Sequence, residues 1–531
     1  MTPPLRALAC ALALGAASGP TSLQAQTTGL TGAPQIARVY DTILDARFEE
    51  VPALLQQTCA PGRSGVPGAQ SRPDPAVCQL LDVVSLWWQI QLDPFDTSRD
   101  AAFESKANAS ITAMEAWTRN EPRRAEAWFY LGGAYGARGQ WRVLRGQVLS
   151  AARDGKRIKD ALERSLTLDP NLKDAWFGIG LYHYYADVAP AAAKMLRFLL
   201  FLPGGDKTRG MQEMLQARND GQLLRSEADY QLHVLYLWYE HLPLRARELV
   251  AGLRDRYPRN PHFPQLIAEI NDAYLHDDTA SLRAWQNMLD ASREGRLAAP
   301  VMAEARARLG IARQLDRLHE SDAAIDHLRV VVQRAPAAPF GALAQAQLLL
   351  GQSLDRVGSR SEAVQAYRQV LAATETADPL KLAAPARAGL RLVPNAAAAR
   401  AYRLSLEGWR AFERGALTDA DRLLGQSQTL RPGEPVSTYR LARVRLAQDD
   451  AAGALSLLEQ VIAMRPTAMP PTFYAYACLD VAGLLESSAR VRAIELYSRA
   501  ASVFGADERT KEAAQRALAR LSTPRLAPAR P

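Results

Sequence analysis

The C-terminal third of the chain repeats a pattern of apolar and small residues. Pro432 and Pro466 lie 34 residues apart, and aligning the sequence on them places Ala420 over Ala454. Within each copy, large apolar residues are spaced i, i+3 and i+7, which forms one apolar stripe on a helix. Small residues at fixed positions let neighbouring helices approach closely, and the proline ends the second helix because it cannot continue it. The pattern predicts an array of antiparallel helix pairs.

The same spacing recurs through most of the chain. Matching large and small residues appear around Trp128, Ile311 and Gly351, and second helices match around Ala246 and Ala493. No segment shows the strand alternation bounded by hairpin turns that a β-sheet would need. We therefore expect an all-α protein that grows by the addition of helix pairs.

The 34-residue spacing resembles that of the tetratricopeptide repeat (TPR) family. The resemblance implies an α-solenoid of TPR-like antiparallel helix pairs, coiled as a right-handed superhelix in two or more arcs. A weaker resemblance covers residues 160–275, about a fifth of the chain. There "GIGLYHYY", "LPGGDKTRGMQEMLQA" and "RYPRNPHF" are similar to segments of eukaryotic outer-membrane-associated TPR proteins. This second resemblance implies the same fold and an adaptor near a membrane.

The pattern also divides the chain into segments. In one unit the terminating Asp169-Pro170 comes about 14 residues late, so its two helices are expected to be longer by about two turns each. The expected segments are a signal peptide over 1–25, an N-terminal helical region with a disulfide-closed loop over 26–120, modified repeats with lengthened helices over 121–275, repeats over 276–373, a hinge or irregular connection over 374–395, C-terminal repeats over 396–520 and a disordered tail over 521–531.

The first 25 residues have the features of a secretory signal. Arg6 is followed by the apolar run "ALACALALGAA" and then by "TSLQA", whose small residues suit cleavage. The apolar run is too short to span a bilayer as an anchor. We expect export to the periplasm of a Gram-negative bacterium, with secretion from the cell as the alternative.

Export affects how the cysteines are interpreted. Cys59 and Cys78 flank a loop rich in proline and glycine, and a disulfide between them would close this loop in an oxidising compartment. Cys478 lies in an apolar segment and is expected to be a buried free thiol. A metal site needs more ligands at closer spacing than these cysteines offer.

Composition argues against a nucleic-acid partner. The chain has 531 residues, of which 48% are hydrophobic, and its net charge is +8. So small a charge over so long a chain is not the concentrated basic patch of a nucleic-acid-binding protein. Residues 138–164 carry eight Arg or Lys against three acids. A solvated face is the expected explanation, and contact with lipid headgroups or an acidic protein is the alternative.

Three segments suggest chemistry, and none has a coherent catalytic or metal-binding set. His183 occupies a position that packs toward the partner helix, so a hydrogen-bonded core histidine is expected. "PGGDKTRG" departs from a phosphate-binding loop because Asp206 stands where glycine is required. "HESDAAIDH", 319–327, lacks the spacing of a zinc site and spans a turn between helices. We expect no catalytic residue, no cofactor and no metal; an enzyme would need His183 or His233 to meet an acid from another repeat.

The TPR resemblance implies a concave groove lined by fixed positions of each first helix. In two units these positions carry several aromatic side chains, which suit recognition of a peptide or protein. The alternative is that these residues pack against the next turn of the superhelix or against an insertion. The expected groove residues are Asp174, Phe177, Leu181, Tyr184, Tyr185, Tyr402, Trp409 and Phe412.

Together these features predict an exported, non-enzymatic TPR scaffold that binds a protein or peptide in its groove. The alternative is a membrane-peripheral helical protein that handles lipid or other envelope components. That alternative would use the basic stretch 138–164 and the apolar segment 189–202, which is too short to cross a membrane and is otherwise expected to be a core helix.

Overall fold

The computed structural model describes residues 29–59, 72–188 and 204–522. Within these ranges the secondary structure is 24 α-helices and one short 3-10 helix, with no strand. The expected signal peptide, the apolar segment 189–202 and the tail beyond Ser522 lie outside the described residues. Consecutive helices pack against one another as antiparallel pairs, so the all-α solenoid expected from the repeat pattern is the observed fold.

The N-terminal block contains six helices among its described residues. In it α5 and α6 are 20 and 21 residues long, whereas most helices of the later units have 13 to 18. They pack closely because Gly132 of α5 faces Leu162 of α6, where a Cβ would lie 2.7 Å from a methyl group. The helices are α1 (Ala33–Leu44), α2 (Val51–Cys59), α3 (Pro75–Leu92), α4 (Asp100–Asn120), α5 (Ala125–Leu144) and α6 (Val148–Leu168).

In the described part of the chain, four helices then lead into a middle limb, which we define as α12–α18. The four connecting helices are α7 (Ala175–Val188), α9 (Lys207–Asp220), α10 (Arg225–Trp238) and α11 (Pro243–Arg256). The middle limb comprises α12 (His262–Ala273), α13 (Asp278–Arg293), α14 (Pro300–Arg317), α15 (Ser321–Arg334), α16 (Ala342–Arg356), α17 (Arg360–Ala373) and α18 (Ala383–Arg391).

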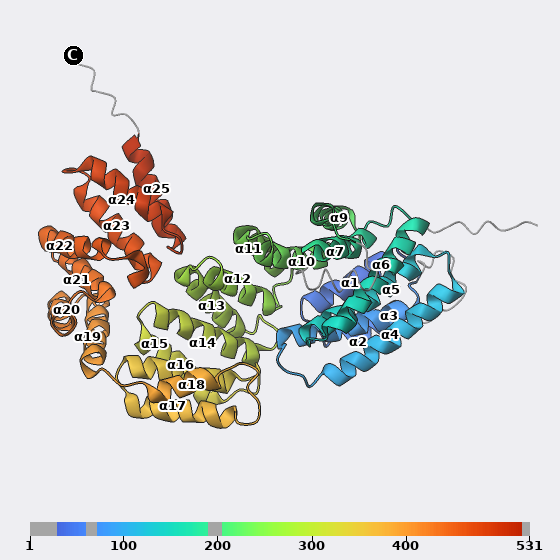
Figure 1. The fold of residues 1–531 in the computed structure, drawn as a ribbon, viewed down its shortest axis with the longest axis horizontal. Helices are drawn as coiled ribbons and strands as arrows, with labels where there is room; N and C mark the ends of the chain where they lie inside the picture. The colour runs from blue at the N-terminus through green and yellow to red at the C-terminus, as the bar shows by residue number, and fades with distance from the viewer. Residues whose placement is uncertain (1–28, 60–71, 189–203, 523–531) are drawn as a thin grey trace, which may run out of the picture.

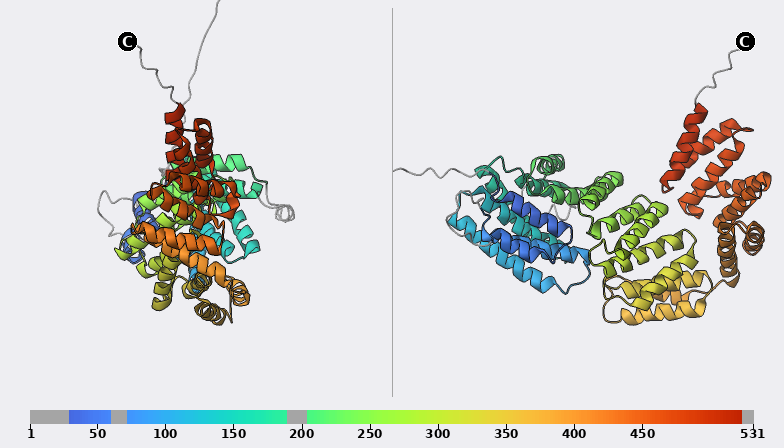
Figure 2. Two further views of the ribbon diagram at one scale, coloured as in Figure 1. Left: turned by 90° about the vertical axis from the view of Figure 1, so that its left-hand side faces the viewer. Right: turned by 180° about the vertical axis from the view of Figure 1, so that it is seen from behind.

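A C-terminal limb, α19–α25, then returns alongside the middle limb, as both face-on views show (Figures 1 and 2). Its helices are α19 (Ala396–Glu413), α20 (Leu417–Leu430), α21 (Pro435–Ala447), α22 (Ala451–Ala463), α23 (Pro471–Leu485), α24 (Arg490–Ser502) and α25 (Glu508–Ser522), with a 3-10 turn at Pro466–Ala468.

The segment 374–395 differs from the hinge or irregular connection expected there. It contains α18, whose Ala386 is fully buried. Gly389 of the same helix lies so close to the ring of Tyr367 that a Cβ would overlap it. The helix therefore packs against α16 and α17, and only the chain on either side of it is irregular.

The C-terminal limb contacts a row of turns in the middle limb, each of which joins the two helices of one unit. His276, His319 and Gly358 lie in these turns and share the left-handed backbone conformation, with φ of 53°, 61° and 83°. Phe504 packs on His276 with ring centroids 5.4 Å apart, and Arg440 donates to the carbonyl oxygen of His319 at 2.9 Å. The inward face of the C-terminal limb is thus partly covered by the turns of the middle limb.

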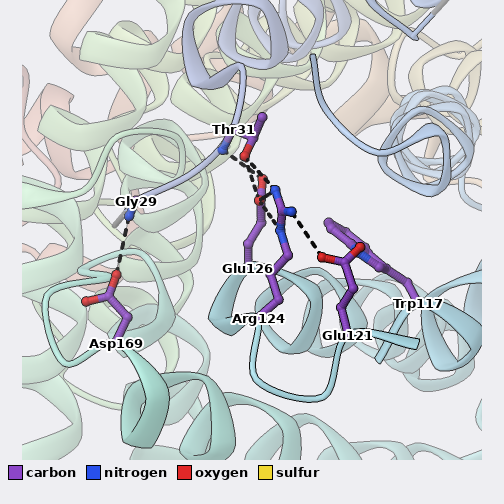
Figure 3. A network of polar contacts seen from close by, with 7 residues as sticks. All are labelled: Gly29, Thr31, Trp117, Glu121, Arg124, Glu126 and Asp169. Atoms are coloured by element: carbon purple, nitrogen blue, oxygen red, sulfur yellow. Dashed lines mark hydrogen bonds and ion pairs between the residues drawn. The ribbon is translucent and has the colours of Figure 1, made fainter. Parts of the chain in front are cut away.

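Residues 29–31 are held on the N-terminal block by a polar network (Figure 3). The backbone N–H and hydroxyl of Thr31 both donate to the buried carboxylate of Glu126, each at 2.8 Å. Arg124 bridges this carboxylate to Glu121 and lies over the ring of Trp117. Helix α1 is thereby anchored at its start.

The far end of α1 is held by residues more than two hundred positions away. Tyr257 donates to Asp41 at 2.7 Å, and the side-chain amide of Asn260 donates to the carbonyl oxygen of Leu44 at 2.7 Å. Between them, Tyr40 donates to Glu227 at 2.6 Å inside the core. The first helix therefore joins the N-terminal block to α10–α12 through buried polar contacts.

The two cysteines of the N-terminal block are joined, as Cys59 and Cys78 form a disulfide in the structure. The loop between them lies mostly outside the described residues. Cys478 is fully buried in α23, and burial raises the pKa of its thiol to about 11. It therefore stays protonated and unreactive at neutral pH.

Two buried histidines and one half-buried histidine predict a loss of stability in mild acid. Burial lowers the pKa of His233 to about 4 and those of His262 and His319 to about 3, with neighbouring arginines adding to the last two shifts. Unfolded histidines have a pKa of about 6.5. As the pH falls below that value the unfolded chain binds protons first, so stability present near neutrality is lost between about pH 6.5 and 4. Thermal unfolding followed by circular dichroism across this range should show it, and the double variant His233→Gln/His262→Gln should show a shallower slope; equal slopes would contradict the assignment.

Candidate protein-binding surface

Helices α7 and α9 approach each other unusually closely at two glycines. A Cβ on Gly180 of α7 would lie 2.6 Å from the carbonyl oxygen of Gly210, and one on Gly210 would lie 2.5 Å from that of Gly180. Real side chains do not tolerate such distances, so both positions require glycine. Asp206 caps α9 by accepting from the N–H of Arg209 at 2.9 Å. The "GIGLYHYY" segment and residues 204–210 are thus the two sides of one helix contact.

His183 lies in the same helix pair and is mostly buried. Its Nδ1 is 2.7 Å from Oε2 of Glu213 on α9, and the other carboxylate oxygen accepts from Nε of Arg209 at 2.8 Å. The expected hydrogen-bonded core position is observed, although its acidic partner comes from the facing helix and not from the same one. His233, the second histidine considered for chemistry, is buried in α10 and bonded to the carbonyl oxygen of Tyr230.

Three of the expected groove residues, one just before α7 and two on it, are not available to a partner. Asp174 is buried and accepts backbone N–H bonds from Gln222, Leu223 and Leu224 at 2.7 to 2.9 Å, which holds the α9–α10 turn. Phe177 and Tyr184 are buried in a core cluster formed with α9 and α10. The prediction that these three line an open groove is wrong because α9 and α10 cover that side of α7; Leu181 is half-buried against the same cluster.

The expected groove residues on α19 lie beside the chain's own α14–α15 turn. The hydroxyl of Tyr402 is 2.8 Å from that of Ser321, and its ring lies 5.7 Å from that of His319. Trp409 and Phe412 are half-buried and stacked on each other, with ring centroids 4.9 Å apart. At this end the structure matches the alternative considered for the groove residues, in which they pack within the superhelix.

One expected groove residue, Tyr185, remains exposed and belongs to a larger surface. Its ring contacts that of Tyr239 edge-on, with centroids 5.7 Å apart. Beyond Tyr239, the α10–α11 turn exposes Trp238, at 62% of its surface, together with Leu242 and Leu244. We define these five residues as the aromatic surface: Tyr185, Trp238, Tyr239, Leu242 and Leu244.

Polar groups border the aromatic surface. Glu240 accepts from Tyr184, and its Oε1 lies 2.9 Å from Nζ of Lys207. Burial acts to raise the pKa of Glu240, but the bonds from Tyr184 and Lys207 outweigh it and hold that pKa below its usual value. The carboxylate is therefore ionised at neutral pH. An apolar centre beside paired charges is the arrangement found in protein–protein interfaces.

Sequence reasoning reached Tyr185 and missed Trp238, Leu242 and Leu244. These three lie at or next to a turn between helices, outside the positions that repeat numbering assigns to a groove. The one available signal is the composition of "LYLWYEHLPL", where large apolar residues continue through the end of a helix. Large apolar residues at the end of a helix are normally buried by the next unit, but Trp238, Leu242 and Leu244 are exposed.

No model of a known protein family and no curated protein matches the sequence. Solved structures of helical repeat proteins are similar at low identity. A tetratricopeptide repeat protein from Parabacteroides merdae is 15% identical over 55% of this chain and 97% of that one, with a TM-score of 0.24. Yeast Tom70 is 11% identical over 86% and 90% of the two chains, and a Rap protein complexed with Competence and Sporulation Factor is 14% identical over 82% and 98%, each with a TM-score of 0.31. These structural neighbours are TPR proteins, and the chain's own consecutive helix pairs form an all-α solenoid.

Proposed function

We propose that the protein is an exported, non-enzymatic scaffold that binds a segment of another protein on the aromatic surface. The observation that carries the proposal is Trp238, a large side chain left mostly exposed at the end of α10, close in the chain to Tyr239, whose ring contacts that of Tyr185. Tryptophan and tyrosine in such positions contribute much of the binding energy of protein interfaces. A fitting partner is an extended or helical segment that offers apolar anchor residues.

Export is supported by the sequence of residues 1–25 and by the disulfide between Cys59 and Cys78, which suits an oxidising compartment. None of the described helices combines the length and apolar character needed to cross a bilayer. A scaffold fits the way the ionisable groups are used, because His183, Glu213 and Arg209 hold a helix pair together. Among residues 29–59, 72–188 and 204–522 no group of metal-ligating side chains is assembled.

The proposal predicts a loss of binding when the aromatic surface is made polar. In Trp238→Ser/Leu244→Ser the fold should persist, because both side chains are largely exposed, while affinity for the partner should fall about 30-fold or more, as for an interface hot spot. Photo-crosslinking in the native cell envelope, with a probe at position 238 or 185, should capture one and the same protein.

Val491 on α24 provides a matched control, since it is apolar, 74% exposed and far along the chain. A probe there should not capture the protein found at 238 and 185, and Val491→Ser should leave binding unchanged. If probes at 238 and 185 capture nothing above this control, or if the double variant binds as the wild type does, the aromatic surface is not the binding site.

A further inference from the structure

A second exposed apolar feature lies at the turn between α5 and α6. Val143 and Val148 are 67% and 68% exposed, and Leu149 is also exposed. The turn itself is made by Gly146, whose φ of 70° suits glycine. The backbone therefore does not require aliphatic residues here, and polar side chains would cost the fold nothing. Their outward position needs an explanation outside the hairpin.

The neighbouring α3–α4 turn adds an aromatic residue to this feature. Arg145 donates to the carbonyl oxygen of Pro94 at 2.6 Å and forms an ion pair with Asp100 at 2.7 Å, which fixes the two turns side by side. Phe95, next to Pro94, is exposed. We define the apolar tip by its exposed members: Phe95, Val143, Leu144, Val148 and Leu149.

Positive charge surrounds the hairpin that carries the tip. Residues 138–164 hold eight basic and three acidic side chains, an excess of five in a chain whose net charge is +8. The inward-facing arginines share one carboxylate, since Asp154 pairs with Arg138 at 2.7 Å and with Arg142 at 2.6 Å. The expectation of a solvated basic face is thus wrong for these two, which are inside the hairpin.

Four of the remaining basic side chains are exposed on α6, namely Arg153, Lys156, Arg157 and Arg164. Arg145 lies at the end of α5, and Lys159 is largely covered and pairs with Glu163 at 2.6 Å. Arg153 and Arg157 are exposed within the first three turns that follow Val148, at about 1.5 Å of rise per residue. Arg157 also lies 3.7 Å from the Asp154 carboxylate. Of the acids near the tip, Asp100 is bound by Arg145, and Asp96 forms a pair with Arg99 at 3.3 Å. The exposed surface behind the tip is therefore cationic.

We propose that the apolar tip docks on an anionic membrane surface, independently of the aromatic surface. Aliphatic side chains at the tip would enter the interfacial layer, which apolar groups penetrate by about 5–10 Å, while Arg153 and Arg157 meet the lipid phosphates. The charge excess selects an anionic surface. An aliphatic turn with a cationic flank can attach a protein to a membrane surface. Such attachment needs no helix that spans the membrane.

Cosedimentation with vesicles tests this proposal. The full mature chain should sediment with vesicles of phosphatidylglycerol and phosphatidylcholine at low salt, and at least tenfold less with phosphatidylcholine alone or in 0.5 M NaCl. Val148→Ser/Leu149→Ser should lower binding at least tenfold, whereas Val491→Ser should not change it. An environment-sensitive dye on Val148→Cys should shift to the blue with anionic vesicles, whereas one on Val491→Cys should not.

The outcomes separate the two surfaces. Binding that is equal on both kinds of vesicle, or unaffected by Val148→Ser/Leu149→Ser, would overturn the proposal, as would an unshifted dye. If no vesicle binds and the tip variant instead loses the protein captured at position 238, the tip is a protein contact and not a membrane contact. Loss of vesicle binding with capture at 238 intact would support the membrane proposal and leave the scaffold function unaffected.

Discussion

Replacing Asp154 by asparagine is expected to destabilise the α5–α6 hairpin by about 3–5 kcal/mol. The carboxylate is fully buried and accepts from Arg138 at 2.7 and 3.0 Å and from Arg142 at 2.6 Å. Asparagine keeps the shape but removes the charge, which leaves two guanidinium groups inside the hairpin without a counter-charge. Hydrogen exchange of the α5 and α6 amides, measured by mass spectrometry, should become faster by a factor that corresponds to this loss.

Asp160→Asn on the same helix is the matched control. Asp160 also binds a cation, Lys156, at 2.5 Å, but both side chains are about half exposed. An exposed pair one turn apart contributes about 0.3–0.5 kcal/mol. Equal acceleration of exchange in the two variants would show that burial does not decide the strength of the Asp154 contact.

Gly180→Val is expected to separate α7 from α9. The new side chain would collide with backbone atoms of α9, which cannot move aside as a flexible side chain can; a Cβ alone would lie 2.9 Å from the backbone nitrogen of Met214. Overpacking costs about 1–3 kcal/mol and occasionally more. Limited proteolysis should then cleave within 204–224, and binding at the aromatic surface should fall because Tyr185 is on the displaced helix.

The control for this change is Gly155→Ala on α6. A Cβ there meets no atom within 4 Å, so alanine should stabilise the helix by about 0.5–1 kcal/mol through its better helix propensity. Should Gly180→Val resist protease as well as Gly155→Ala does, the close approach of α7 and α9 would not be needed for their pairing.

The helix pairs could be predicted from the sequence because their cause is local. Ala420 and Leu424, aligned by the repeat with Ala454 and Leu458, are all fully buried, as the small and large positions of the pattern require. A periodic stripe identifies a helix and its buried side whatever the rest of the chain does. The same reasoning placed His183 in the core, since its repeat position faces the partner helix.

The open surfaces could not be predicted, because they depend on how units far apart in sequence meet. Tyr402 is covered by Ser321 across 81 residues, and Arg440 reaches His319 across 121. A 34-residue period contains no information about contacts over such separations. The exposure of Trp238 could not be predicted either. The local sequence does not distinguish an aromatic residue that the next unit covers from one that it leaves exposed.

The long-range bonds of α1 set the order in which the protein can fold. Tyr257 and Asn260, which hold α1 at Asp41 and Leu44, are synthesised 216 residues later. At a translation rate of about 5–20 residues per second, α1 waits roughly 10–40 s for these partners. Helices α19 and α20, by contrast, can pair as soon as both are made. A chain that ends short of Asn260 therefore lacks the bonds that hold the far end of α1.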